Sequence, residues 1–560
     1  MVRRFLNLIG KEIRGLHEAA YLLGFFALLS QILALLRDRL FAHSFGAGPT
    51  LDIYYAAFRI PDFIFVSVAS LVSFSVIIPF LVQELDVSKD RARQFLSQVF
   101  SAFSLSILAV SVVAFFLVPF LIPILYPGFA GTEAAAELTV LIRILLVQPI
   151  VLGISGFLAS ITQVYQRFVA YAASPILYNL GIIIGVLFLY PSLGIPGLGY
   201  GVVLGALLHL ALQLGVSWKN NLVPRFLPRF SKKEVLRVVR ISLPRALTLS
   251  AHQLALIFLV GLASLFGVGS VAIFSLAFNL QSVPLTIVGM SYAVAAFPTL
   301  SRLFARGESD TFCSQMITAA RHILFWSIPA TVLFIVLRAH IVRVILGSGE
   351  FGWIETRLTA AGLALFAVSL AAQGLVLLLV RGYYAAGRTK VPLIINTLSS
   401  GVIIASAFGL SWLFDTAPLW RYFIESLLRV EGIEGVKVLM LPLAYSLGVI
   451  VNVIALWVLF ERDFKSLWRS VERMVFQVFS AAVVMGFVTH TALRALDEFF
   501  DVQTLPGVFG QGFVAGVIGI VVGVALLLVL ENNEIKEIWH AVHRKVWRVP
   551  RVGMEEHGEL

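Results

Sequence analysis

The chain has 560 residues, of which 59% are hydrophobic and 13% are charged, and its mean hydropathy is +0.94. Soluble domains contain about 25% charged residues, so this composition excludes a soluble globular protein and indicates a polytopic membrane protein. The net charge of +11 does not point to nucleic acid, because the basic residues lie in loops between apolar segments, where anionic lipid head groups are the expected partners.

A basic, amphipathic segment at residues 1–18 predicts a helix that lies in the membrane interface. Apolar segments of about 20 residues or more follow, and they predict transmembrane helices rather than the shorter alternating strands of a β-barrel. The tail at 533–560 is amphipathic and predicts a cytoplasmic surface helix, and residues 420–430 show the same pattern more weakly. We expect fourteen transmembrane helices, at residues 20–43, 51–82, 95–126, 135–160, 170–190, 197–217, 233–265, 268–302, 310–338, 354–382, 390–414, 436–460, 470–497 and 508–531.

Loop charges give the predicted orientation of these helices. The loops after helices 1, 3, 5 and 7 contain no Lys or Arg. Basic residues gather instead after even-numbered helices, at Lys89, Arg91 and Arg93, at Arg225, Arg229, Lys232 and Lys233, at Arg302 and Arg306, and at Arg462, Lys465 and Arg469. The positive-inside rule therefore predicts that both termini are cytoplasmic.

The chain repeats itself along its length. The sequence FGAG at 45–48 recurs as FGVG at 266–269, and PILYN at 175–179 is echoed by PLIIN at 392–396. The repeat spans six helices, an even number, so the two halves have the same orientation in the membrane. Two six-helix lobes related in this way, facing a central cavity, are typical of alternating-access transporters.

The predicted fold is therefore an all-α polytopic membrane protein with about 14 transmembrane helices. Its two lobes are parallel repeats, and two extra helices follow at the C-terminus. The expected organisation is an interfacial helix at 1–18, an N-lobe at 19–220 (helices 1–6), a C-lobe at 221–435 (helices 7–11) completed by helix 12 at 436–462, helices 13 and 14 at 463–532, and the tail at 533–560.

Charged residues inside the first two helices are the strongest functional signal. A charge at bilayer depth costs roughly 2.5–3.5 kcal/mol, so Arg37, Asp38, Asp52 and Arg59 are expected to face the bundle interior or a wet cavity. In one interpretation Arg37 binds an anion, and Asp38 or Asp52 orients it or binds a cation. In the other, these residues form a structural ion-pair network that pins helices 1 and 2. Arg37 and Asp38 are adjacent and do not share a helix face, which leaves a bond between them open.

A second polar stripe lies on helix 7. Arg245 and His252 are seven residues apart and share one face, which suits a cavity lining, although a lone histidine in a membrane helix is also a common packing residue. Four prolines are candidate hinges or packing kinks, namely Pro61, Pro79, Pro284 and Pro298.

No pattern for catalysis or metal binding appears in the sequence. The single cysteine, Cys313, can form neither an internal disulfide nor a cysteine-based metal site. FGAG lacks the Lys-Ser/Thr of a phosphate-binding loop. We therefore expect a protein that is not an enzyme and has no metal and no cofactor.

The segment at 35–61, LLRDRLFAHSFGAGPTLDIYYAAFRIP, closely resembles the start of the MurJ (MviN) lipid II flippases, within the multidrug/oligosaccharidyl-lipid/polysaccharide exporter superfamily. The resemblance continues at 163–179, 242–258, 277–305 and 381–392 and covers essentially helices 1–12. It implies an alternating-access flippase of the bacterial inner membrane that carries an undecaprenyl-pyrophosphate-linked saccharide.

The resemblance also implies a substrate site built from cavity arginines. Arg37 matches one arginine of the family's set. The other family arginines fall on Gln31, near Phe65 and on Asn279. The substrate-binding candidates are therefore Gln31, Arg37, Asp38, Asp52, Arg59, Arg245, His252 and Asn279, with Arg59, Arg245 and His252 as a hypothetical replacement for the missing positive charge.

Two alternatives to a lipid II flippase stay open at this point. In the first alternative the cargo is another undecaprenyl-linked oligosaccharide. In the second the protein is a non-transporting family member that scaffolds envelope synthesis. The buried charges favour transport, because a scaffold gains nothing from their insertion cost. We expect a monomer in contact with membrane lipids, with cell-wall synthesis proteins as candidate partners and with the membrane potential or a monovalent cation as the candidate driving force.

Overall fold

The computed structural model describes residues 16–72, 84, 87–164, 167–219, 223–227, 231–464 and 468–536. Pro79, most of the predicted interfacial helix at 1–18 and most of the tail at 533–560 lie outside these residues. Within them the chain is helical and contains no strand, as expected from its long apolar segments.

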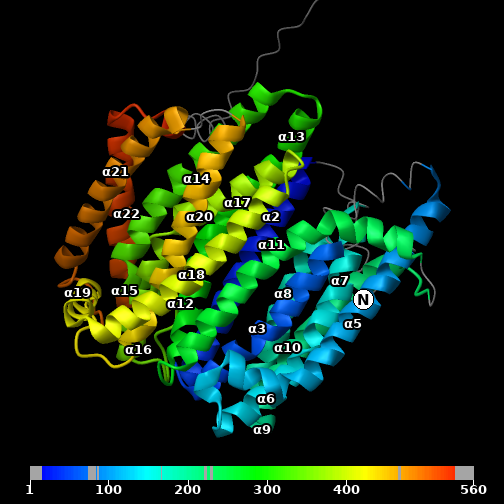
Figure 1. Cartoon of the computed structure of the whole chain (residues 1–560). Coiled ribbons are helices and arrows are strands. Elements are labelled where there is room, and N and C mark those ends of the chain that lie inside the picture. Colours follow the sequence, from blue (N-terminus) through cyan, green and yellow to red (C-terminus); the bar gives the residue numbers. More distant parts are fainter. Residues whose placement is uncertain are drawn as a thin grey trace, which may run out of the picture.

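The N-lobe is a bundle of helices (Figure 1). Its helices are α2 (Leu16–Phe45), α3 (Pro49–Ala69), α5 (Lys89–Leu125), α6 (Glu133–Leu145), α7 (Val147–Val164), α8 (Phe168–Ile184), α9 (Tyr190–Leu193) and α10 (Ile195–Lys219). Short 3₁₀ or π turns lie between some of them, at Ser70–Val72, Pro127–Phe129 and Gly185–Leu189.

The C-lobe repeats this plan, and two further helices follow it. Its helices are α11 (Lys232–Ser264), α12 (Ser270–Pro284), α13 (Ser291–Ala305), α14 (Ser309–Val336), α15 (Arg338–Ile345), α16 (Trp353–Ala367), α17 (Leu370–Ala385), α18 (Lys390–Thr416), α19 (Pro418–Leu428) and α20 (Met440–Phe464). The additional pair, α21 (Trp468–Ala495) and α22 (Leu505–Val529), lies on the outer flank of the C-lobe, in orange and red in Figure 1.

Each of the fourteen predicted spans coincides with one helix or with two consecutive helices, and the span at 51–82 is described up to residue 72. Among the described residues, eleven helical segments are long and apolar enough to cross a bilayer, and the pair α16 and α17, bent by 45°, makes a twelfth. Helix α3 is 21 residues long and contains three charged residues, Asp52, Arg59 and Asp62.

The internal repeat is visible in the same local breaks of the two lobes. The fourth span of the N-lobe is broken between α6 and α7, and the fourth span of the C-lobe is broken between α16 and α17. The turn between α2 and α3 requires a left-handed Gly46, with φ of 57°, and the matching turn between α11 and α12 requires Gly267 and Gly269, with φ of 105° and 88°. The structure thus has two six-helix lobes as parallel repeats.

The lobes meet along a seam formed by α3, α5, α11 and α12. One buried apolar cluster crosses this seam and includes Leu51 from α3 and Phe274 from α12. Separate clusters lie away from it, one around Phe312 and Phe460 in the C-lobe and one around Leu212 in the N-lobe. The two lobes are therefore joined on one side and keep their own cores elsewhere.

The backbones of the two lobes approach most closely at the end that carries the α2–α3 and α11–α12 turns. A side-chain carbon at Gly128 would lie 1.8 Å from the carbonyl oxygen of Ser264, so only glycine fits there. The amide of Glu350 also donates to the carbonyl oxygen of His43 at 3.1 Å. We call this end the closed end.

Candidate functional site

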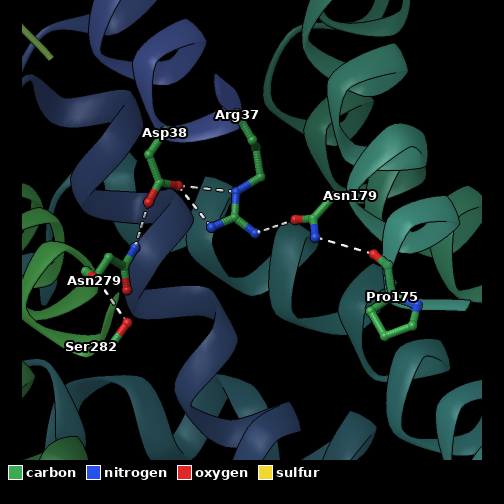
Figure 2. Close-up of polar contacts among 6 residues, drawn as sticks. All are labelled: Arg37, Asp38, Pro175, Asn179, Asn279 and Ser282. Atoms are coloured by element: carbon green, nitrogen blue, oxygen red, sulfur yellow. Dashed lines mark hydrogen bonds and ion pairs between the residues drawn. The ribbon is translucent and has the colours of Figure 1, made fainter. Parts of the chain in front are cut away.

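Arg37 and Asp38 form the centre of a polar network between the lobes, shown in Figure 2. The guanidinium of Arg37 donates from Nε and Nη2 to Asp38 Oδ1, at 3.0 and 2.7 Å, and from Nη1 to Asn179 Oδ1 at 2.9 Å. The second carboxylate oxygen, Asp38 Oδ2, accepts from Asn279 Nδ2 at 3.1 Å. Asp38 therefore bonds at once to a cation of its own helix and to α12 of the other lobe.

This geometry is compatible both with anion binding by Arg37 and with a structural ion-pair network. The two side chains bond although they are adjacent on α2, and the network ties α2 to α8 and α12 rather than to α3. An arginine has five N–H donors, and three are used here. The Arg37 side chain is 20% exposed, against 4% for Asp38, so Arg37 is the more accessible member of the pair.

Asp52 lies across the interface from the start of α12. Its Oδ2 accepts from the amide of Gly269 at 2.6 Å and its Oδ1 from the amide of Ala272 at 2.8 Å. The side chain of Asp52 is buried, and the carboxylate satisfies free amides where the helix dipole favours negative charge. The structure therefore places Asp52 as an interlobe helix cap, with both oxygens engaged.

Arg59 contacts the other lobe two turns further along α3. Its Nη2 donates to Ser275 Oγ on α12 at 3.3 Å, and its Nε is buried without a partner in the described part of the chain. Asp62 and His252 lie close enough to Arg59 to feel its charge. His252 is half-buried on α11 and packs edge-on against Tyr445, with ring centroids 5.9 Å apart. Arg59, Asp62 and His252 thus form a second charged group between the lobes.

The remaining candidates lie outside these two groups. Arg245 places its guanidinium 5.9 Å from the ring centroid of Tyr384, within the C-lobe. Gln31 is half-buried on α2, six residues before Arg37, which is about 9 Å along a helix axis. The structure brings Arg37, Asp38 and Asn279 together, brings Arg59 and His252 together, and leaves Arg245 and Gln31 apart from both sets.

Three of the candidate hinge prolines lie in helices of the two lobes. Pro61 is buried inside α3, and Pro298 lies inside α13. Pro284 ends α12 directly before a π turn at Leu285–Met290. A proline beside a π turn is a common cause of a helix bend.

Sequence reasoning did not select three residues that the structure places in this interface. Asn179 orients Arg37 and in turn donates to the carbonyl oxygen of Pro175 at 3.1 Å. Arg39 donates to the carbonyl oxygens of Val344 and Ile345, at the end of α15. Asn179 belongs to the repeated PILYN segment, which was the available signal, whereas nothing near Arg39 indicates its partner. The third residue, Ser275, has no distinguishing pattern. Among the described residues no three His, Cys, Asp or Glu side chains gather as metal ligands.

Two parallel six-helix lobes, with charged groups held between them, define a polytopic membrane transporter of the alternating-access class. The chain belongs to the MurJ lipid II flippase family, whose family model matches residues 41–510.

Similar proteins cover much of the chain at low identity. A probable lipid II flippase MurJ of Rhizobium tropici is 28% identical over 65% of this chain and 70% of its own length. The corresponding protein of Buchnera aphidicola is 27% identical over 77% of this chain and 89% of its own length. A solved lipid II flippase MurJ in an inward closed conformation covers 93% of this chain and 100% of its own, with a TM-score of 0.69 and 22% identity, and an inward-facing MATE family transporter reaches a TM-score of 0.62 at 15% identity. At these identities the two structural matches support the fold alone.

Proposed function

We propose that this protein is a lipid II flippase of the bacterial inner membrane, working by alternating access with both termini in the cytoplasm. Its substrate would be an undecaprenyl-pyrophosphate-linked saccharide, and it would act as a transporter without catalysing a chemical conversion. Membership of the MurJ family is the single observation that carries this proposal. The positive-inside distribution of loop charges supports the orientation.

The geometry of Arg37 supports a specific role in substrate binding. A pyrophosphate is best held by arginine forks, and Arg37 has two unused donors and an exposed fraction of 20%. Asp38 holds Arg37 and Asn279 at the same time. A pyrophosphate that takes Arg37 from Asp38 would therefore change the bond that links the two lobes, which couples binding to lobe movement.

With cytoplasmic termini, the closed end faces outward. Substrate would then enter from the cytoplasmic leaflet, and release would require the Asp52 cap on α12 to break. The energy source is the membrane potential or a monovalent cation, and no cofactor takes part in this scheme. We expect the protein to act as a monomer.

The direct test is complementation of a bacterium depleted of its own lipid II flippase, combined with an assay of lipid II accessibility at the outer surface. The proposal predicts growth rescue and outward exposure of lipid II for the wild-type chain, and loss of both for Arg37→Ala. The proposal would be refuted by a properly inserted protein that gives no growth rescue and no outward exposure of lipid II. Exposure of a different undecaprenyl-linked oligosaccharide without lipid II would change the cargo and keep the mechanism.

A further inference from the structure

Helix α19 is apolar on two opposite sides. One side is directed into the protein, with Ile424 at 2% and Leu428 at 7% exposure. The opposite side carries Leu419 and Tyr422, which are 82% and 64% exposed. A helix next to a membrane span can present such a second apolar side to lipid without the cost of facing water.

A groove lies between α19 and the end of α18. Its volume is about 870 Å³, and it is lined by Leu413 of α18, by Ala417 between the two helices, and by Trp420, Phe423 and Leu427 of α19. This volume lies within the range of small-molecule sites, and apart from Ser426 the lining side chains are aliphatic or aromatic. The groove therefore fits a hydrocarbon chain.

The groove is continuous with the lipid-facing surface of a membrane span. Phe408 and Trp412 lie one turn apart on α18 and are 52% and 66% exposed, and Leu413 next to them lines the groove. Tryptophan and tyrosine concentrate where hydrocarbon gives way to head groups. Helix α19 belongs to the closed end, because Lys437, in the segment that follows α19, lies 4.9 Å from the ring of Phe266 in the α11–α12 turn. The level of the lipid head groups at this end is therefore marked by Trp412, Trp420 and Tyr422.

Three arginines lie close to the C-terminal end of α19. Arg429 follows Leu427 by two residues, and Arg338 and Arg357 reach the same end from other helices. Arg338 donates to the carbonyl oxygen of Leu428 at 3.4 Å, and Arg357 donates to that of Arg429 at 3.1 Å. Arg429 is exposed and left-handed, with φ of 59°, and lies close enough to Arg338 for their charges to repel. Within the described ranges none of the three forms an ion pair with a carboxylate. The C-terminal end of a helix favours positive charge. The three guanidinium groups here also keep several unused N–H donors.

We propose that this surface binds one anionic phospholipid from the leaflet at the closed end, with an acyl chain in the α18–α19 groove and its phosphate on Arg429 and the neighbouring arginines. The apolar groove, its continuity with the lipid-facing surface and the three arginines, which form no ion pair in the described part of the chain, carry this assignment together. The site is separate from the interlobe network and does not depend on what the protein transports.

The test is native mass spectrometry of the purified full-length chain titrated with dioleoyl-phosphatidylglycerol, compared with dioleoyl-phosphatidylcholine. The wild type is expected to retain one phosphatidylglycerol that Arg357→Gln/Arg429→Gln binds roughly tenfold more weakly, because charge-assisted hydrogen bonds are lost. Leu427→Ser is expected to weaken the same binding from the acyl side. Arg306→Gln is the matched control, since Arg306 is an exposed arginine in the loop between α13 and α14 that lies 3.9 Å from Glu308.

Equal retention of phosphatidylglycerol by the wild type and the double arginine variant would overturn the site. So would equal affinity for phosphatidylcholine, or displacement of the bound lipid by inorganic phosphate at the same concentration. Leu427 is 58% exposed, so Leu427→Ser is expected to stay folded and keeps the test decisive if the double variant melts early.

Discussion

Asp38 accepts bonds from both lobes, and this double bonding gives the interface its chemical sensitivity. The carboxylate receives two N–H groups from Arg37 and one from Asn279. A buried charge that loses one partner becomes costly unless another replaces it. Events at Arg37 are therefore transmitted to α12 through a single carboxylate.

Exchange of the groups at positions 38 and 279 tests this link. Asn279→Asp would place two carboxylates at hydrogen-bond distance and is expected to cost several kcal/mol, because like charges meet at membrane depth. Asp38→Asn in the same chain restores a carboxylate–amide pair with the partners reversed. We expect a clear fall in melting temperature of the detergent-solubilised single variant and partial recovery in the double variant. Additive effects of the two changes would show that residues 38 and 279 are not coupled.

The cap formed by Asp52 makes a second prediction at this scale. Asp52→Asn keeps the size of the side chain but loses the charge and one acceptor, so Gly269 and Ala272 lose one of their two cap bonds. Hydrogen exchange of these amides is expected to become roughly tenfold faster. Asp90→Asn is the control, because Asp90 is exposed in the first turn of α5. Unchanged exchange at 269–272 would show that the cap does not hold α12.

At this scale the sequence indicated which charged residues lie between the lobes better than it indicated their partners, and the role of these residues in transport stays a prediction. The insertion cost of a charge identified Arg37, Asp38, Asp52 and Arg59 without any structure. The bonds of Asp52 to α12 could not be predicted, because a cap across two lobes has no sequence spacing. Arg245 shows the converse, since it shares a helix face with His252 yet contacts Tyr384 of its own lobe.

At the scale of elements, the closed end depends on backbones that touch. The 3₁₀ turn at Pro127–Phe129 lies against the end of α11, where the amide of Gly128 donates to Ser264 Oγ at 3.1 Å. No side chain fits between these elements at Gly128, because the Ser264 carbonyl oxygen is too near. Closure therefore requires a residue without a Cβ at this position.

Gly128→Ala is expected to act as a wedge that shifts the population away from the closed end. Spin labels at Thr132→Cys and Leu265→Cys, in a Cys313→Ser background, should report a longer distance distribution by pulsed electron resonance. Gly156→Ala is the control, since no heavy atom lies within 4 Å of its added carbon. The same distance distribution in Gly128→Ala and the wild type would mean that this contact does not determine closure.

The positions and lengths of most elements could be predicted from hydropathy alone, and the breaks inside them could not. Within the described residues each predicted span coincides with helix, yet the divisions between α6 and α7 and between α16 and α17 fall inside apolar sequence. Neither Leu146 nor Val368 is a residue that ends a helix by itself. These breaks depend on tertiary packing, which short-range patterns do not contain.

At the scale of the whole molecule, the seam and the closed end define one conformation of an alternating-access transporter. The lobes share a buried cluster along α3, α5, α11 and α12 and keep separate cores elsewhere. Alternating access requires a second state in which the Asp52 cap and the Gly128 contact are broken. The two six-helix repeats could be predicted from the recurring FGAG and PILYN segments, because a repeat of whole folding units leaves its spacing in the sequence.

The second charged group, formed by Arg59, Asp62 and His252, leads to a prediction about transport. Arg59→Ala would remove a cation from the lobe interface beside Asp62 and His252, whereas Arg245→Ala would remove one that contacts Tyr384 within the C-lobe. We expect Arg59→Ala to lower transport at least tenfold and Arg245→Ala to lower it less, in a complementation and lipid II accessibility assay at matched protein levels. The reverse order would place the anion site around α11 and α17 instead of between the lobes.

The most direct test of the central claim is lipid II translocation in proteoliposomes that contain only this protein. Labelled lipid II in the inner leaflet should become accessible from outside with the wild-type chain, and an ion gradient or membrane potential can be imposed to find the driving force. We predict translocation by the wild type and by Arg306→Gln and its loss in Arg37→Ala, with all three folded. Translocation that persists undiminished in Arg37→Ala, or its absence in the wild type under every gradient, would contradict this account.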